Sequence, residues 1–109
     1  RELLDAYDGA CAITKCTLEE VLEAAHISPF KGSSTNTVQN GLLLRADIHT
    51  LFDKGLIAID TSDWTIIVNS KLEQTEYGAL SAQRLNLPIE RQHRPNIDAL
   101  DIHRVVSNL

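Results

Sequence analysis

The stretch LLLRADIHTLFDKG, from residue 42 to residue 55, constrains the fold of this chain more than any other part of it. Its apolar side chains recur at the spacing that lines one face of a helix: Leu44, Ile48, Leu51 and Phe52. Gly55 then stands where helices commonly end. We therefore expect a helix over 42–55 with one face packed on a core.

Shorter elements are expected before this helix. Thr17 and Glu20 have the spacing of a capping box, and Pro29 biases the residues before it towards extended backbone. In chain order, the sequence predicts a helix ending at Gly9, a short strand over 10–14, a short helix over 18–22, an extended segment over 23–27 and a polar loop over 31–41.

The chain after residue 55 predicts a hairpin and further helices. LIAID (56–60) and WTIIVN (64–69) are apolar runs of strand length separated by a turn, and helices are expected over 76–85 and 97–106. These elements together predict an α+β fold. We expect a single domain over 1–109, with a core over about 10–69 and a helical extension over about 75–109, within a larger protein.

Composition limits the functions that can be considered. The 109 residues carry a net charge of −5, which weighs against a broad basic surface that holds nucleic acid by itself. No apolar run is long enough to cross a bilayer, and the opening stretch RELLDAYDG lacks the basic-then-apolar pattern of a secretory signal. We therefore expect a cytoplasmic protein that does not associate with membranes.

Two groups of polar residues are candidates for chemistry. Arg45, His49 and Asp53 are spaced to share one face of the expected helix, where they could bind a metal and a phosphate or form a solvated ion pair. His26 follows two alanines at the end of an extended segment. Taken alone, a histidine in this setting is more often structural than catalytic.

Taken together, His26, Asn40 and His49 form a pattern. Asn40 follows His26 by fourteen residues and precedes His49 by nine, within the flanking stretches AAHISP and NGLLLRADIHTLFDKGL. With these flanks, the chain resembles the HNH endonucleases, the ββα-metal nucleases. The resemblance covers about half of the chain. It implies a small ββα-metal core, here with an added β-hairpin and C-terminal helices.

The resemblance implies a role for each matching residue. His26 corresponds to the general base that takes a proton from the water attacking a phosphodiester, and Asn40 to an amide that braces the loop. His49 corresponds to a ligand of one divalent cation. Arg45 is an additional candidate for binding the DNA phosphate, inferred from the expected helix face and not from the resemblance.

This sequence departs from the family pattern at Ala25. Many relatives have an aspartate there as a second metal ligand, so the remaining ligands must come from Asp47, Asp53, His26 or water. The donor set leaves magnesium, manganese, nickel and zinc open.

A second departure concerns structural zinc. Many HNH domains bind zinc through two cysteine pairs, but Arg45 and Ile48 stand where the second pair would fall. Cys11 and Cys16 alone do not complete a four-ligand site. We expect both to be packed free thiols, with no structural zinc.

The resemblance therefore implies a metal-dependent DNA endonuclease domain, part of a bacterial restriction or antiphage effector. Its expected partners are DNA and other domains of the same polypeptide, and a homodimer is left open. One alternative is a catalytically inactive HNH-like module that binds DNA or protein. The other is a zinc module built on Cys11, Cys16 and two histidines.

Overall fold

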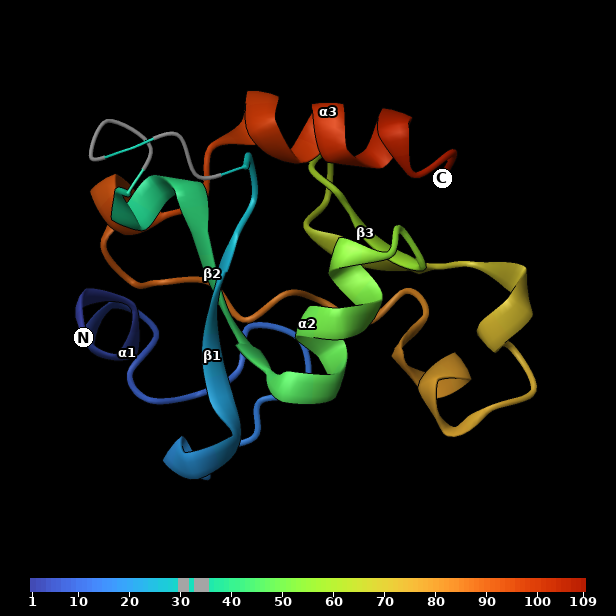
Figure 1. The fold of residues 1–109 in the computed structure, drawn as a ribbon, viewed down its shortest axis with the longest axis horizontal. Coiled ribbons are helices and arrows are strands. Elements are labelled where there is room, and N and C mark those ends of the chain that lie inside the picture. The colour runs from blue at the N-terminus through green and yellow to red at the C-terminus, as the bar shows by residue number, and fades with distance from the viewer. Residues whose placement is uncertain (30–31, 33–35) are drawn as a thin grey trace.

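A computed structural model describes residues 1–29, 32 and 36–109 of the chain (Figure 1). The helices and strands, in order, are α1 (Glu2–Ala6), β1 (Leu22–His26), β2 (Gly41–Arg45), α2 (Ala46–Asp53), β3 (Ile57–Asp60), β4 (Thr65–Val68) and α3 (Ile97–Val106). Short 3-10 turns are η1 (Glu19–Val21), η3 (Val38–Asn40), η4 (Ser70–Leu72), η5 (Glu76–Leu80) and η6 (Arg91–His93). The predicted α+β class is confirmed.

The centre of the fold is a ββα unit. β1 and β2 pair antiparallel, with His26 opposite Gly41 and Leu22 opposite Arg45. α2 begins directly after Arg45 and packs against both strands (Figure 1). This arrangement brings the end of β1 close to the outer face of α2, and it is the ββα core that the resemblance implied.

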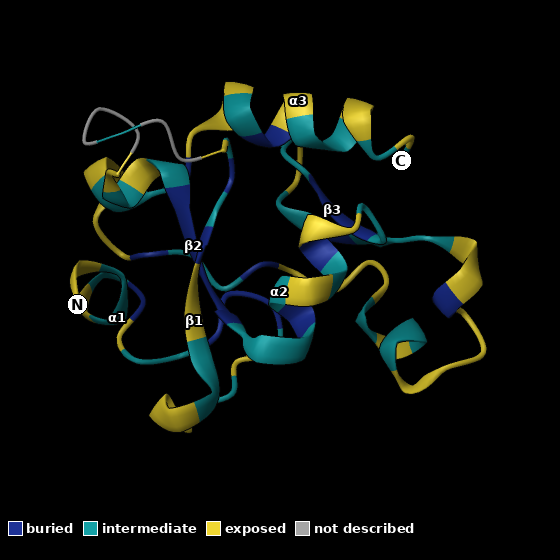
Figure 2. Ribbon diagram, in the orientation of Figure 1, coloured by how far each residue is buried: buried dark blue, intermediate teal, exposed yellow. Residues whose placement is uncertain are grey.

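The helix predicted over 42–55 is shorter than expected. Its first four residues belong to β2, and only Ala46–Asp53 are helical. Leu42, Leu43 and Leu44 are all buried, and β2 is dark blue in Figure 2. The helices α1 and α2 both pack against this strand. A run of consecutive buried residues suits a covered strand better than one face of a helix. The helix ends at Asp53, and Gly55 follows its C-cap Lys54 with a left-handed φ of +71°, as the sequence predicted for a glycine that ends a helix.

Two of the elements predicted for the C-terminal part are present in the structure. β3 and β4 form the predicted antiparallel hairpin, and α3 spans the predicted residues 97–106. Asn96 is the N-cap of α3, and its side chain accepts a hydrogen bond from the Ala99 backbone N–H. It packs against β3 and runs along one side of the molecule (Figure 1). No helix within the described residues has the length and apolar character needed to cross a membrane.

Two short elements near the N-terminus were predicted wrongly. Residues 10–14 form a turn and not a strand, because the Cys11 sulfur accepts the N–H groups of Ile13 and Thr14 at 3.4 and 3.3 Å. The helix expected over 18–22 is a single 3-10 turn without a side-chain cap, and Leu22 already belongs to β1. Strand pairing with β2 replaces the helix there. Of the loop expected over 31–41, residues 31 and 33–35 lie outside the described residues. Its last part is more ordered than predicted, because Val38–Asn40 form the turn η3 and Gly41 already belongs to β2.

The helix predicted over 76–85 is also wrong. Only the 3-10 turn η5 forms, and the chain then runs extended beside β4. The Ile66 N–H donates to the Gln83 carbonyl, and the Leu85 N–H donates to the Trp64 carbonyl. These bonds pair backbone N–H and C=O groups at the edge of β4 that would otherwise lack partners within the sheet. Pairing with β4 therefore replaces the predicted helix. The extension over 75–109 is therefore only partly helical.

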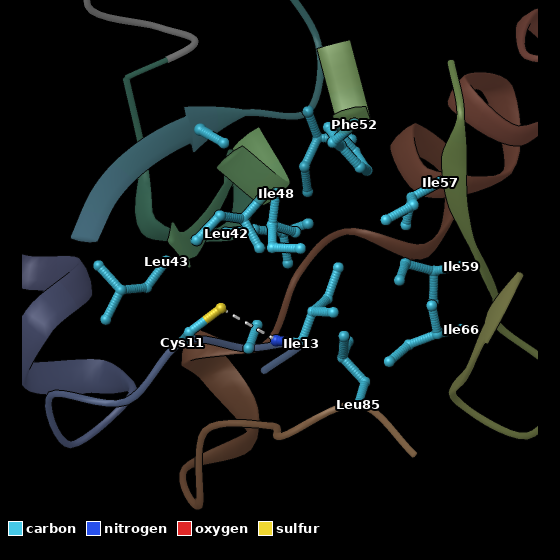
Figure 3. Packing of buried hydrophobic residues seen from close by; sticks show 14 of the residues in the cluster. Cys11, Ile13, Leu42, Leu43, Ile48, Phe52, Ile57, Ile59, Ile66 and Leu85 are labelled. Carbon is cyan, nitrogen blue, oxygen red and sulfur yellow. Dashed lines mark hydrogen bonds between the residues drawn. The ribbon is translucent and has the colours of Figure 1, made fainter. Parts of the chain in front are cut away.

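One cluster of buried side chains joins these elements (Figure 3). Cys11 and Ile13 from the N-terminal turn meet side chains of β2, α2 and both strands of the hairpin; the buried members include Leu42, Leu44, Ile48, Phe52, Ile57, Ile59, Ile66, Leu85 and Leu100. α2 contributes Ile48 and Phe52 on its inner face. This leaves the opposite face of α2, including His49 and Asp53, for the surface.

Candidate active site

A pocket of about 460 Å³ lies between the end of β1, the outer face of α2 and helix α3. Its walls are formed by Ala24, His26, Ile27, Ser28, Pro29, His49, Phe52, Asp53, Ala99, Ile102, His103 and Val106. Both histidines of the sequence pattern therefore face one cavity. None of these lining residues is a lysine or an arginine.

His26 occupies the last position of β1. Ala24 shares its face of the strand and also lines the pocket, whereas Ala25 is only 1% exposed and points into the core. A carboxylate at position 25 of this chain would consequently be buried among apolar side chains. The metal-ligating position of other family members is thus unsuited to a charged residue here.

Asn40 braces the chain that follows His26. Its side-chain oxygen accepts the Ser28 N–H at 2.9 Å, and its side-chain nitrogen donates to the Ser28 carbonyl at 3.1 Å. Its backbone carbonyl also accepts the Ile27 N–H at 2.9 Å. Three hydrogen bonds with Asn40 thus hold Ile27 and Ser28, the two residues after His26.

His49 lies between two carboxylates. Its Nδ1 is 2.8 Å from Glu23 Oε1 on β1, and its Nε2 is 3.2 Å from Asp53 Oδ2 one helical turn onward. The His49 side chain is 24% exposed. Asp53 was predicted from the helical spacing. Glu23 was missed, because the contact depends on how α2 packs across β1, although its place three residues before His26 was visible in the sequence.

The donor atoms around His49 suit a divalent cation in type. Imidazole and carboxylate groups are ligands of zinc, manganese and nickel. Within the described residues, no three His, Cys, Asp or Glu side chains are arranged to hold one ion together. A cation at His49 and Asp53 would thus take its remaining ligands from water and substrate phosphate, as magnesium sites commonly do.

His103 is a second residue that the sequence did not assign to this site. It projects from α3 into the pocket wall, where its ring stacks on Phe52 with centroids 3.7 Å apart and planes 6° from parallel. Its Nε2 donates to the Phe52 carbonyl at 2.8 Å. The residue therefore ties α3 to the C-terminal turn of α2, just before Asp53.

Arg45 and Asp47 do not join this pocket. Arg45 precedes α2 as its N-cap and is not on the helical face shared by His49 and Asp53, so that expectation is wrong. Its Nε and Nη2 donate to Asp47 Oδ1 and Oδ2 at 2.7 and 3.0 Å. Arg45 lines a different cavity, of about 320 Å³, beside Lys15 and Tyr77.

The charges of this second cluster satisfy one another. The hydrogen bond from Arg45 holds the pKa of Asp47 at about 2, and the Asp47 carboxylate in turn raises the pKa of Arg45. The Tyr77 hydroxyl donates to Asp47 Oδ2 at 2.8 Å, which raises the pKa of that hydroxyl. The oxygens of Asp47 are therefore occupied by Arg45 and Tyr77, away from His49.

The two cysteines pack beside the Arg45 cluster. Cys11 is fully buried, and its sulfur accepts a third backbone N–H, that of Arg45, at 3.3 Å. Cys16 packs against the same core, and both are free thiols. The packing predicted for them is confirmed. Neither cysteine belongs to a group of three potential metal ligands within the part of the chain that is described.

Residues 11–60 match the family model of the HNH endonucleases. The matched region begins at Cys11, contains the whole ββα unit with His26, Asn40 and His49, and ends with β3. The resemblance drawn from the sequence is thereby confirmed. No curated protein matches the chain.

The fold is similar to a solved structure of a modification-dependent TagI restriction endonuclease, with a TM-score of 0.65 at 17% sequence identity. The similarity covers 96% of this chain, including α3, but 35% of the other one. The present chain thus spans about a third of the length of that enzyme. At this identity, the likeness establishes the shared fold.

Proposed function

Since residues 11–60 match the HNH endonuclease family model, we propose that this chain is a metal-dependent endonuclease domain that hydrolyses phosphodiester bonds in DNA. One observation carries the assignment of the site: His26 and His49, from different elements, line the same pocket. We assign His26 as the general base, Asn40 as the brace of its loop, and His49 with Asp53 as ligands of a divalent cation.

The reaction follows from these positions. A ring nitrogen of His26 takes a proton from water as the water oxygen attacks phosphorus, and the bond from phosphorus to the leaving sugar oxygen breaks. Histidine suits this step because its ordinary pKa lies close to neutral pH. The hydrogen bonds of Asn40 to Ser28 keep the end of β1 in place while His26 changes charge.

A divalent cation held by His49 and Asp53 would supply positive charge that the described lining of the pocket does not. When bound, it offsets the negative charge on the scissile phosphate and on the leaving oxygen. Among the described residues, the pocket lining has no lysine or arginine for this purpose, and two carboxylates, Glu23 and Asp53, flank His49. Arg45, bound to Asp47 in another cavity, is not part of the proposed phosphate site.

We propose that other parts of a longer protein deliver DNA to this domain. The net charge of −5 and the acidic surroundings of His49 favour weak binding of DNA by the domain itself. The structural relative is a restriction endonuclease whose chain is about three times as long. This supports a place in a restriction or antiphage effector whose other domains select the target.

Plasmid cleavage by the full-length protein tests the proposal. The wild-type protein is expected to nick or linearise supercoiled plasmid in at least one of magnesium, manganese, nickel or zinc, and His26→Ala is expected to abolish this. His93→Ala is the matched control, because His93 is outside the pocket. Cleavage that survives equally in His26→Ala, or is absent in all four metals, would contradict the proposal.

A catalytically inactive binding module is the second candidate. It is favoured by one observation, that no group of three potential ligands is assembled among the described residues. This candidate predicts DNA binding without cleavage. A gel-shift assay run beside the plasmid assay, on the same preparations, separates the two.

A further inference from the structure

We propose that Glu23 is a positioning residue that orients the His49 ring so that its Nε2, together with Asp53, faces a divalent cation. This role rests on the proposed function, because it concerns the same metal. Glu23 was not among the residues suggested by the sequence pattern, and it is placed by tertiary contact.

The geometry gives Glu23 direct control of His49. Its Oε1 lies 2.8 Å from His49 Nδ1, the usual length of a hydrogen bond in which one partner is charged. Glu23 comes from β1, which also carries His26, and His49 comes from α2, which packs on β1. The bond therefore fixes the ring relative to the strand that carries the proposed base.

The chemistry of the contact sets the protonation of the ring. An ionised carboxylate only accepts hydrogen bonds, so Nδ1 carries the proton that is donated to Glu23. In a neutral imidazole the lone pair is then on Nε2, the atom that faces Asp53. A carboxylate on the other ring nitrogen is the usual support of a metal-binding histidine, since it fixes both tautomer and orientation.

The gap between His49 and Asp53 agrees with this assignment. His49 Nε2 and Asp53 Oδ2 are 3.2 Å apart. Two acceptor atoms at this distance repel each other unless they share a proton or a metal ion. Neighbouring ligands of one ion, with bonds of about 2.1 Å, lie about 3.0–3.4 Å apart in octahedral or tetrahedral coordination. The pair is thus spaced as two ligands of one cation.

The position of Glu23 also accounts for Ala25. Residue 25 faces the core, so this chain cannot place a carboxylate beside its base at that point. Glu23 lies at a more exposed part of the same strand, with its side chain 51% exposed, and its longer side chain reaches His49. The acidic group that acts on His49 from β1 therefore comes from two positions earlier.

Metal affinity in the absence of DNA tests the proposal. Manganese, nickel and zinc chloride are titrated separately into the full-length protein by calorimetry, for wild type, Glu23→Gln and Glu23→Asp. Glu23→Gln is expected to weaken binding by about 10–100-fold, the usual effect of removing such a supporting group, and Glu23→Asp to lose less. Glu20→Gln is the control, because it removes the same charge from an exposed position close by.

Nitrogen NMR of the histidine rings adds a measurement that a purely structural role would not change. In the zinc-loaded wild type, His49 is expected to show a protonated Nδ1 and a coordinated Nε2. Glu23→Gln is expected to populate the other tautomer while the thermal midpoint stays close to wild type. Coordination through Nδ1 in the wild type would overturn the proposal.

The outcomes separate this proposal from the proposed function. Equal metal affinity of Glu23→Gln and wild type overturns the role of Glu23, and DNA cleavage that depends on His26 would still stand. Absence of cleavage overturns the nuclease assignment, and a loss of metal affinity in Glu23→Gln would still stand. Wild-type protein that binds none of the three ions overturns both.

Discussion

The two ends of α2 carry two polar clusters that differ in how their charges are balanced. At the N-terminal end, Arg45 and Asp47 pair through two hydrogen bonds and Tyr77 completes the set. At the C-terminal end, His49 lies between the carboxylates of Glu23 and Asp53, beside the pocket that contains His26.

This difference distinguishes a structural cluster from a candidate site. The N-terminal cluster has a cation for its anion, and its hydrogen bonds leave little capacity for a ligand. The C-terminal cluster has two acids for one imidazole, so it gains from an added cation. An excess of acceptors next to a cavity is therefore the better indication of a metal site than the mere presence of charged residues.

The largest expected effect concerns catalysis in the pocket beside the C-terminal end of α2. His26→Ala is expected to lower the cleavage rate by about 10²–10⁴-fold, the usual contribution of a general base. Arg45→Gln, at the other end of α2, is expected to change the rate by less than a few-fold. Plasmid cleavage under identical metal conditions measures both. Equal losses in the two variants would remove the distinction between the clusters.

The next effect concerns the packing that holds α3 against the site. Phe52 is fully buried and stacks on His103, so Phe52→Ala is expected to reduce the free energy of unfolding by about 3–5 kcal/mol. Ile102→Ala is the control; Ile102 is 64% exposed, and a change of at most about 0.5 kcal/mol is expected. Urea denaturation measures both. A small effect of Phe52→Ala would mean that α3 is not coupled to α2 through this contact.

A smaller effect is expected from the ion pair at the N-terminal end. The side chains of Arg45 and Asp47 are 33% and 37% exposed, so water screens their attraction. A double-mutant cycle with Arg45→Gln and Asp47→Asn is expected to give a coupling energy of about 0.5–1 kcal/mol. Urea denaturation of the four proteins supplies the cycle. A coupling of several kcal/mol would show that this cluster is a main support of the fold.

The smallest effect concerns pH. The pKa of Asp47 is about 2 in the folded protein and higher in the unfolded chain, so the unfolded state binds the proton first as pH falls. The stability from this group is present above about pH 4 and is lost as the pH falls to about 2. Asp47→Asn is expected to flatten this part of the profile. Thermal midpoints in EDTA, which excludes metal effects, are the measurement; identical slopes would contradict it.

Much of the site could be predicted because local sequence carries it. The spacing of His49 and Asp53 is one helical turn, and α2 does place the two side chains 3.2 Å apart. The same rule failed for Arg45, because β2 continues through that residue and the helix begins at Ala46. Local spacing is informative only within an element whose boundaries are known.

Contacts between separate elements could not be predicted from local spacing. His103 reaches the pocket from a helix fifty-four residues after His49, and Glu23 reaches His49 from a paired strand. The wrong helix over 76–85 has a similar cause, since the edge of β4 accepts that segment as an extended neighbour. The positions of His103, Glu23 and residues 76–85 all depend on how separate elements pack together, which local sequence patterns do not describe.

The sequence by itself determined the α+β class, the hairpin, the span of α3 and the pattern of His26, Asn40 and His49. These features depend on short-range spacing, turn residues and apolar periodicity, which are written along the chain. Only the tertiary structure decided that Asp47 is bound to Arg45 and Tyr77, that Glu23 contacts His49, and that His103 lines the same pocket. Such pairings depend on how β1, α2 and α3 pack together, because atoms distant along the chain meet only in the folded molecule.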